Sequence, residues 1–200
     1  VQESYPLTNT QEGIFIECTA NMGSTIYNIP YLLKLDNKVD LDRLAEAIDS
    51  TVEAHPYLKT RLFMDDNGNV LQKRNDGLSY KTPILNGMNR DTLVRPYMLF
   101  NEQLFRFEIH RTCDGNYLFL DIHHIVADGT SLSIILNDIN GAYSGEKLET
   151  ETYTSYDLAL DNRDALASDA YKNAENYYKS VFENAGGSIN FYPDKSGAAP

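Results

Sequence analysis

The feature that most constrains the fold is a strand pattern that passes into a helix pattern across two adjacent histidines. Residues 118–122 are apolar and β-prone, with Asp121 as their one charge, and predict a buried strand. After the histidines, Thr130 is a candidate N-cap and Gly141 a candidate helix stop. The helix expected between them has apolar residues at helical spacing: Leu132, Ile135, Leu136 and Ile139. Such a strand, turn and helix can hold functional side chains at the mouth of a cleft.

Strand geometry separates the two imidazoles. Successive side chains of a strand point to opposite faces, so we expect one of His123 and His124 to face a cleft and the other to lie in the interior. The pattern alone leaves open which does which. A histidine titrates near pH ~6.5, so the one facing the cleft could exchange protons at neutral pH. Asp128 could fix the turn by pairing with a cation, and Gly129 would allow a positive φ or close approach of a ligand.

The segment from His123 to Gly129, HHIVADG, resembles the signature of the condensation domains of nonribosomal peptide synthetases. That signature is shared with the wider superfamily that resembles chloramphenicol acetyltransferase. Three further stretches resemble motifs of the family and follow its order. They are Leu7–Phe15, His55–Leu62 and Tyr153–Ala159.

The resemblance implies amide formation between two substrates carried on the phosphopantetheine of upstream and downstream peptidyl carrier proteins, with no cofactor bound directly. The second motif histidine, here His124, faces the reaction centre in the family, as a general base or a positioning group. The resemblance gives His123 and Asp128 structural roles and places Gly129 where backbone approaches the reacting group.

One departure from the family pattern concerns the partner of Asp128. The family's second motif carries an arginine that pairs with the motif aspartate, and Lys59 stands in its place here. Lysine supplies a point charge without the planar two-pronged geometry of a guanidinium. Arg61 has the same strand parity and is the other candidate partner. The arginine that often opens this motif is replaced by Ala54.

Chain length sets a further expectation. Domains of this family have two similar lobes and are roughly twice as long as these 200 residues. We therefore expect residues 1–185 to form an N-terminal lobe and residues 186–200 to be a linker toward a C-terminal lobe. Because catalysis requires positioned reactants, we expect the lobe alone to have little or no activity.

Composition excludes several classes of protein. The net charge of −12 argues against nucleic acid or an anionic membrane as a partner. No apolar run approaches the ~20 residues that span a bilayer, and no signal peptide is visible. Cys18 and Cys113 are interpreted as free core thiols of a cytoplasmic protein, with a single disulfide left open. The histidines lack the spacing of a metal site.

The remaining patterns predict an α/β fold in which a mixed β-sheet is layered with helices. Asp40 is the expected N-cap of a helix over 41–54, which Pro56 prevents from continuing. Turn sequences at 65–69 and 112–115 predict two hairpins. An amphipathic helix is expected over about 168–184, ended by Gly186-Gly187, and the order within 75–100 is left unassigned.

Other functions fit parts of the same pattern. A related acyltransferase would move acyl groups from coenzyme A to an alcohol or amine. Related domains also epimerise or cyclise, although the cyclising ones usually carry aspartate in place of the first histidine. A non-catalytic module that docks carrier proteins would leave His124 merely packed.

Overall fold

The computed structural model describes residues 4–100 and 102–183. These residues divide into two units, one up to Asn162 and one from Arg163 onward. The first unit contains both β-sheets and all the stretches singled out in the sequence, apart from the last predicted helix.

A four-stranded mixed sheet forms the centre of the first unit. Its strands are ordered β2 (Asn28–Lys34), β7 (Gly115–His123), β6 (Phe105–Thr112) and β5 (Ile84–Asn86). β5 runs parallel to β6, and the other neighbours are antiparallel. The mixed α/β class and the 112–115 hairpin are thereby confirmed.

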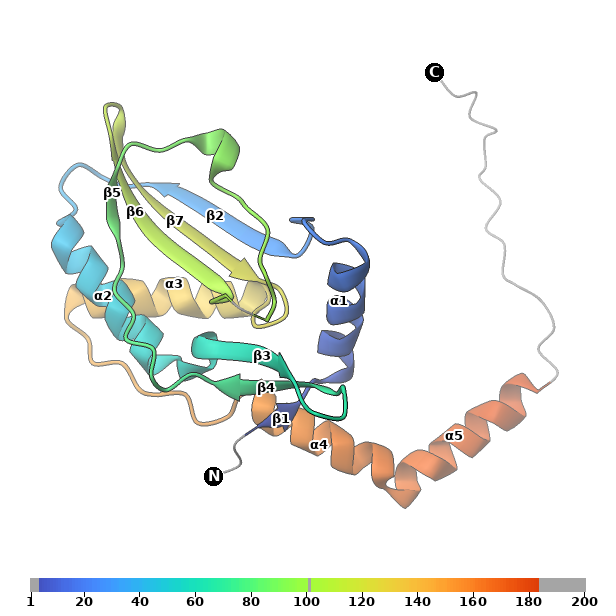
Figure 1. Ribbon diagram of the computed structural model, residues 1–200. Helices are drawn as coiled ribbons and strands as arrows, with labels where there is room; N and C mark the ends of the chain where they lie inside the picture. The colour runs from blue at the N-terminus through green and yellow to red at the C-terminus, as the bar shows by residue number, and fades with distance from the viewer. Residues whose placement is uncertain (1–3, 101, 184–200) are drawn as a thin grey trace, which may run out of the picture. The chain divides into compact units, whose positions relative to one another are not determined.

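Helices α2 (Leu41–Ala54) and α3 (Gly129–Ser144) lie together on one face of this sheet (Figure 1). The bounds predicted for α2 are confirmed. Its N-cap Asp40 accepts from the backbone N–H groups of Asp42 and Arg43. The core between sheet and helices is aliphatic and aromatic, and includes Ile48, Val52, Phe105, Phe107, Ile109, Leu118, Leu120, Ile122, Ile135 and Ile139. Alternate residues of β6 and β7 supply it, as period-2 strand geometry requires.

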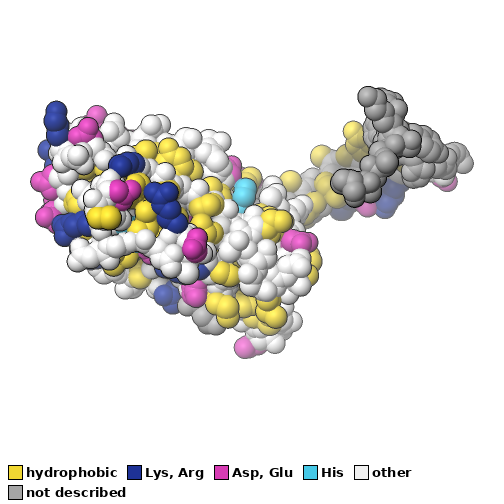
Figure 2. All heavy atoms as spheres, turned by 90° about the horizontal axis from the view of Figure 1, so that it is seen from above, with side chains coloured by type: hydrophobic (Ala, Val, Ile, Leu, Met, Phe, Trp, Pro, Cys, Tyr) yellow, Lys and Arg dark blue, Asp and Glu magenta, His cyan; other side chains and the backbone are white. Residues whose placement is uncertain are grey.

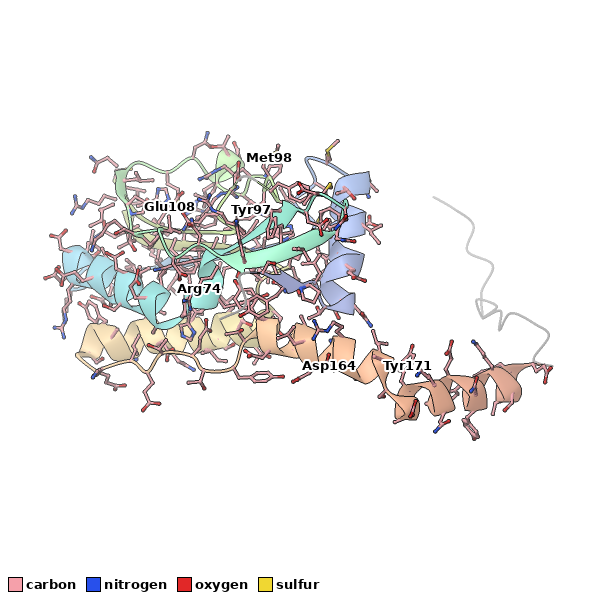
Figure 3. The ribbon with its side chains drawn as sticks, turned by 60° about the horizontal axis from the view of Figure 1, so that its bottom comes forward. Arg74, Tyr97, Met98, Glu108, Asp164 and Tyr171 are labelled. Carbon is pink, nitrogen blue, oxygen red and sulfur yellow. The ribbon has the colours of Figure 1, made fainter. Side chains whose placement is uncertain are left out.

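The opposite face of the sheet carries a buried charge. Asp121 is fully buried, and its Oδ2 accepts from Asn28 at 2.8 Å and from the Arg106 guanidinium at 3.2 Å. The Tyr97 hydroxyl donates to the Asp121 backbone carbonyl, and its ring lies 3.6 Å below the Arg106 guanidinium carbon. Tyr97 and Glu108 are labelled in Figure 3. Burial raises the pKa of Asp121, against the opposing effects of Asn28 and Arg106.

A second, three-stranded sheet has the order β1 (Tyr5–Pro6), β4 (Val70–Arg74) and β3 (Thr60–Met64). The hairpin predicted at 65–69 is confirmed. Asp65 accepts from two backbone N–H groups of this turn, and Gly68 takes the positive φ of 84° that the turn requires. Between α2 and β3, residues Pro56–Lys59 form the 3₁₀ turn η1.

Helix α1 (Asn9–Ala20) was not expected from the sequence, because its apolar residues form no continuous stripe. Thr8 and Gln11 form a capping box at its start. In the 75–100 region that the sequence left unassigned, β5 is followed by the 3₁₀ turn η2 (Arg90–Thr92).

The ends of α3 differ from the prediction. Asp128, not Thr130, is the N-cap, because its carboxylate reaches the Ser131 backbone N–H. Gly141 lies inside the helix, and Gly145 ends it in a left-handed conformation with φ 93°.

Both cysteines are free thiols. Cys18 is half-buried, but Cys113 is exposed in the turn between β6 and β7, so the expectation of two core thiols is wrong for Cys113.

Helix α4 (Ser155–Ala167) begins in the first unit. The second unit contains α5 (Asp169–Phe182), which confirms the helix predicted near 168–184. Ser168 caps it by accepting from the Tyr171 N–H. The predicted stop at Gly186-Gly187 and the linker at 186–200 lie outside the described residues.

Within the described ranges, no helix combines the length and the apolar character needed to cross a bilayer. Acidic and basic side chains are interspersed on the face of the molecule shown in Figure 2.

A buried amide pair joins α1 to the three-stranded sheet. Gln72 of β4 is fully buried, and Gln11 of α1 is 5% exposed. The Gln72 amide nitrogen donates to the Pro6 carbonyl at 2.9 Å and to Gln11 Oε1 at 3.1 Å. Its oxygen accepts from the Tyr57 hydroxyl at 2.9 Å and from Gln11 Nε2 at 3.2 Å. Each of these groups therefore has a polar partner away from water.

Gln72→Leu should destabilise the first unit by about 1–3 kcal/mol, because it leaves buried partners of the amide unpaired. Urea unfolding, followed by circular dichroism, measures this. Lys73→Leu is the matched control on the same strand. Its exposed side chain should change stability by about 0.5 kcal/mol or less. Equal effects of the two substitutions would contradict the role given to the amide pair.

Candidate active site

The two histidines lie where β7 ends, and neighbouring backbone holds both of them. The His123 N–H donates to the Leu104 carbonyl and the His124 N–H to the Tyr27 carbonyl, each at 2.8 Å. The Val126 N–H then closes the turn onto the His123 carbonyl at 3.0 Å. Residues 124–128, which lead from β7 to α3, are called the motif loop below.

His123 belongs to the interior. It is 4% exposed, and its Nδ1 accepts from the Ile125 N–H at 3.1 Å. The ring proton of the neutral form therefore sits on Nε2, which faces the Cys18 sulfur at 3.6 Å. Burial, the neighbouring His124 and the Arg106 charge lower the pKa of His123 to about 4. The ring is neutral at pH 7 and unsuited to proton exchange there.

His124 is exposed, whereas the other three histidines are buried or half-buried. Its ring meets the Tyr27 ring edge to face, with centroids 6.4 Å apart. One imidazole is interior, as expected, and the structure identifies it as His123, whereas His124 is the exposed one. That His124 faces a cleft stays a prediction. Its backbone is anchored to Tyr27, the residue before β2, and within residues 4–100 and 102–183 no hydrogen bond engages its ring nitrogens.

Asp128 is held locally. Its Oδ1 accepts from the backbone N–H and from the hydroxyl of Ser131, both at 2.8 Å, and the Ser131 oxygen accepts from the Asp128 N–H at 3.3 Å. These bonds from Ser131 lower the pKa of Asp128, with smaller contributions from the Thr130 N–H and the His124 charge. The acid thus stays ionised and fixes the point where the motif loop enters α3.

The expected pairing of Asp128 with Lys59 or Arg61 is not formed in the described structure. Lys59 is 7% exposed, and its ammonium pairs with Glu53. Arg61 is exposed and lies beside Asn75, whose amide oxygen, when turned toward it, accepts two guanidinium bonds at 3.1 Å. Each cation thus has an acceptor other than Asp128.

Gly129 is the first residue of α3 and does not have a positive φ. A Cβ added there would meet nothing within 4 Å. The prediction that Gly129 has a positive φ is therefore wrong. The structure instead shows open space beside the motif loop at this residue.

The four motif-like stretches meet in one buried polar network. Gln11 of the first donates to the Tyr57 hydroxyl of the second and to the Ile125 carbonyl of the motif loop, both at 2.8 Å. Tyr156 of the fourth shares a hydrogen bond with Thr60 of the second at 2.6 Å. The Tyr57 and Tyr156 rings meet edge to face at 4.7 Å. Sequence reasoning missed Gln72 of this network, since one glutamine in a strand carries no signal of its partners.

His55 is the C-cap of α2, and its ring is placed between two carboxylates. It lies 2.6 Å from Asp138 of α3 and 3.3 Å from Glu151. His55 and Glu151 line a pocket of about 220 Å³ together with Val126, Ala127 and Ser131 beside the motif loop. His110 is a core residue, 5% exposed, bonded to the Gly87 carbonyl and to Glu108.

Among residues 4–100 and 102–183, no group of histidine, cysteine and carboxylate side chains could hold a metal ion.

His123 should titrate with a midpoint near pH 4 in the folded protein, as followed by NMR of its ring Cε1–H. An unfolded histidine takes its proton near pH ~6.5, so the unfolded chain binds more protons between these values. Stability should therefore be full above about pH 6.5 and fall, by on the order of 3 kcal/mol from this group, as the pH drops toward 4. A midpoint near 6.5 in the folded protein would contradict the burial argument.

Asp128→Ala should cost about 0.5–2 kcal/mol of stability through the lost cap of α3, as measured by urea unfolding. Asp128→Asn keeps a capping oxygen and should retain most of the stability. A destabilising Lys59→Met together with a neutral Asp128→Ala would contradict the conclusion that Asp128 acts as the local cap of α3.

Comparison with known proteins gives a consistent result. The model of a family described as "Condensation domain" matches residues 1–199. Surfactin synthase subunit 2 of Bacillus subtilis (strain 168) is 30% identical over 189 residues, which are 91% of this chain and 5% of that protein. Tyrocidine synthase 3 of Brevibacillus parabrevis is 29% identical over 185 residues, which are 89% of this chain and 3% of that protein.

Solved structures with the same fold cover nearly the whole chain. The condensation domain from the Monacolin K polyketide synthase MokA aligns with a TM-score of 0.79 and 21% identity, over 96% of this chain and 46% of that one. The starter condensation domain of the rhizomide synthetase RzmA aligns with a TM-score of 0.75 and 17% identity, over 92% and 48%.

The chain spans about half the length of these solved structures and only 3–5% of the two synthases. The fold is that of condensation domains, which is the chloramphenicol acetyltransferase-like fold. With a family model that matches almost every residue, this chain belongs to the condensation domain family of the nonribosomal peptide synthetases.

Proposed function

We propose that this chain is the N-terminal lobe of a condensation domain that joins an acyl or peptidyl donor to an aminoacyl acceptor through an amide bond. Both substrates would be thioesters on the phosphopantetheine of peptidyl carrier proteins, and no cofactor would be bound directly. The observation that carries the proposal is the contrast within the histidine pair. His123 is buried and neutral, while His124 stands exposed on an anchored backbone.

In this reaction the acceptor amine attacks the donor thioester carbonyl, so that a C–N bond forms and the C–S bond breaks. The pantetheine sulfur leaves as a thiolate, and the proton that the amine loses finally passes to this sulfur, so that a free thiol results. His124 would take that proton as a general base, or orient the amine and stabilise the charged intermediate. An exposed ring on a fixed backbone suits either role, because both require a nitrogen that reaches the substrate from a defined point.

Supporting roles follow for the rest of the motif. His123 would hold the end of β7 through its bond with the Ile125 N–H, and Asp128 would fix the start of α3. The open space beside Gly129 would leave room for substrate next to His124. Lys59 and Arg61 keep no direct role at Asp128 in this proposal.

The partners would be an upstream and a downstream carrier protein and a C-terminal lobe, following the length of the similar structures, of which this chain covers 46–48%. Neither nucleic acid nor membrane is proposed, given the charge of −12. The cytoplasm, where the aminoacyl substrates are made, would be the site of action.

His124→Ala, introduced into a longer protein that contains both lobes, should reduce carrier-dependent amide formation by about 10²-fold or more, as expected on losing a general base. The product is counted by mass spectrometry after adding carrier-bound donor and acceptor. His124→Gln is the second variant, and it tests whether a side chain of similar shape that cannot exchange a proton is sufficient. His110→Ala is not used as a control, because His110 is buried and its removal would open the core. The 200-residue chain alone should give little or no product.

The alternatives give different results in the same assay. Product from acyl-coenzyme A and a free amine, without carriers, would make the protein a coenzyme A-dependent acyltransferase. Full activity of the His124→Ala variant would overturn the role of this histidine. Binding of carrier proteins with no product from any donor would favour a non-catalytic docking module.

A further inference from the structure

His55 makes two contacts that a neutral imidazole cannot both satisfy. Its Nε2 lies 2.6 Å from Asp138 Oδ2, and its Nδ1 lies 3.3 Å from Glu151 Oε2. A neutral ring carries one N–H, so one of these contacts would set a lone pair against a carboxylate. An imidazolium donates to both. The geometry itself therefore calls for a protonated ring.

The three side chains come from different parts of the chain and are largely withdrawn from water. The side chains of His55, Asp138 and Glu151 are 15%, 32% and 20% exposed. Glu151 is fastened further, because its other oxygen accepts from the Tyr57 N–H at 2.5 Å and its own N–H donates to the Ala54 carbonyl at 3.0 Å. The end of α2, the middle of α3 and the segment before α4 thus meet at one imidazole.

This cluster borders the same pocket as the motif loop. His55 and Glu151 lie on its wall, as do Val126, Ala127 and Ser131. Ser131 is the residue that forms the capping box with Asp128. A shift of α3 relative to the end of α2 would therefore change the pocket and the support of the loop that carries His124.

We propose that His55 is a positioning residue whose imidazolium ties α3 and the Glu151 segment to the end of α2, and so holds the motif loop in place in a pH-dependent way. This hold on the motif loop is independent of any catalytic role. Its relevance to catalysis rests on the proposed function of His124.

The charges around the ring set the direction of the pH dependence. Asp138 faces the ring from α3 and Glu151 from the segment before α4, while the nearby charges of α2 and η1, Glu53 and Lys59, pair with each other. The hydrogen bond with Glu151 is the largest cause that raises the pKa of His55, with Asp138 adding to it and burial opposing it. The tie is thus complete below about pH 6.5 and is lost as the pH rises through the raised folded pKa.

NMR of the 200-residue chain tests the tie without substrates. The His55 Cε1–H signal should titrate with a midpoint above 6.5, and the methyl signals of Val126 and Ala127 should shift with the same midpoint. Asp138→Asn should move the His55 midpoint down toward 6.5. Glu146→Gln removes one exposed charge just beyond α3 and should leave the midpoint unchanged.

In His55→Gln the two methyl signals should lose this titration. If that variant does not fold, Asp138→Asn carries the test, because it keeps the imidazole and the shape of the site. A His55 midpoint at or below 6.5, or methyl signals that stay constant through the His55 titration, would overturn the proposal.

In an active two-lobed protein, the His55 tie should affect kcat and KM differently. kcat should fall as the pH rises through the His55 midpoint, with KM little changed, and this limb should be absent in His55→Gln. A protein with no amide-forming activity under any condition would refute the proposed function and leave the NMR result on the tie standing.

Discussion

The constraint on which the rest of this structure depends is the burial of β7 on both faces. Seven of its nine residues are buried, so the polar side chains on it depend on partners within the protein. Asp121 Oδ2 lies between Asn28 and Arg106, and His123 receives the Ile125 N–H. Among the described residues, Asp121 Oδ1 has no hydrogen-bond partner, so the burial of this carboxylate is only half compensated. Because burial disfavours the charged form of an imidazole, the first motif histidine is kept neutral by its position in the strand.

The contrast between the two histidines follows from where the strand ends. His123 is the last residue of β7 and shares the face of Asp121, whereas His124 begins the turn. The His124 N–H remains bonded to the carbonyl of Tyr27, just before β2, although its ring is exposed. An exposed side chain on a fixed main chain combines access with a defined position, which few loop residues have. Strand parity separates the two rings, but which of them lies inside is decided by packing against α1, β2, Tyr97 and Leu104.

Local signals decided which elements could be predicted. α2 was predictable because a capping aspartate, an apolar stripe and Pro56 all lie close together in the chain. β5 was not, because it has three residues and pairs in parallel with β6, a strand distant in the sequence. The same distinction between local and long-range signals applies to the candidate site. The local strand pattern limited the exposed histidine to one of two adjacent residues. Gln72, Asp138 and Glu151 could not be found in this way, because they act through contacts between segments that are distant in the sequence.

Asp128 shows how a local bond can replace a distant one. A long-range ion pair with Lys59 or Arg61 would require a flexible cation to be ordered across the fold, at a cost in side-chain entropy. Ser131 lies three residues away on a helix whose N-terminus already favours a negative charge, so the capping box forms with little additional ordering. Lys59, meanwhile, finds Glu53 six residues back along the chain. The cap at the start of α3 therefore forms without Lys59, and the turn that follows His124 does not depend on which cation stands at this position.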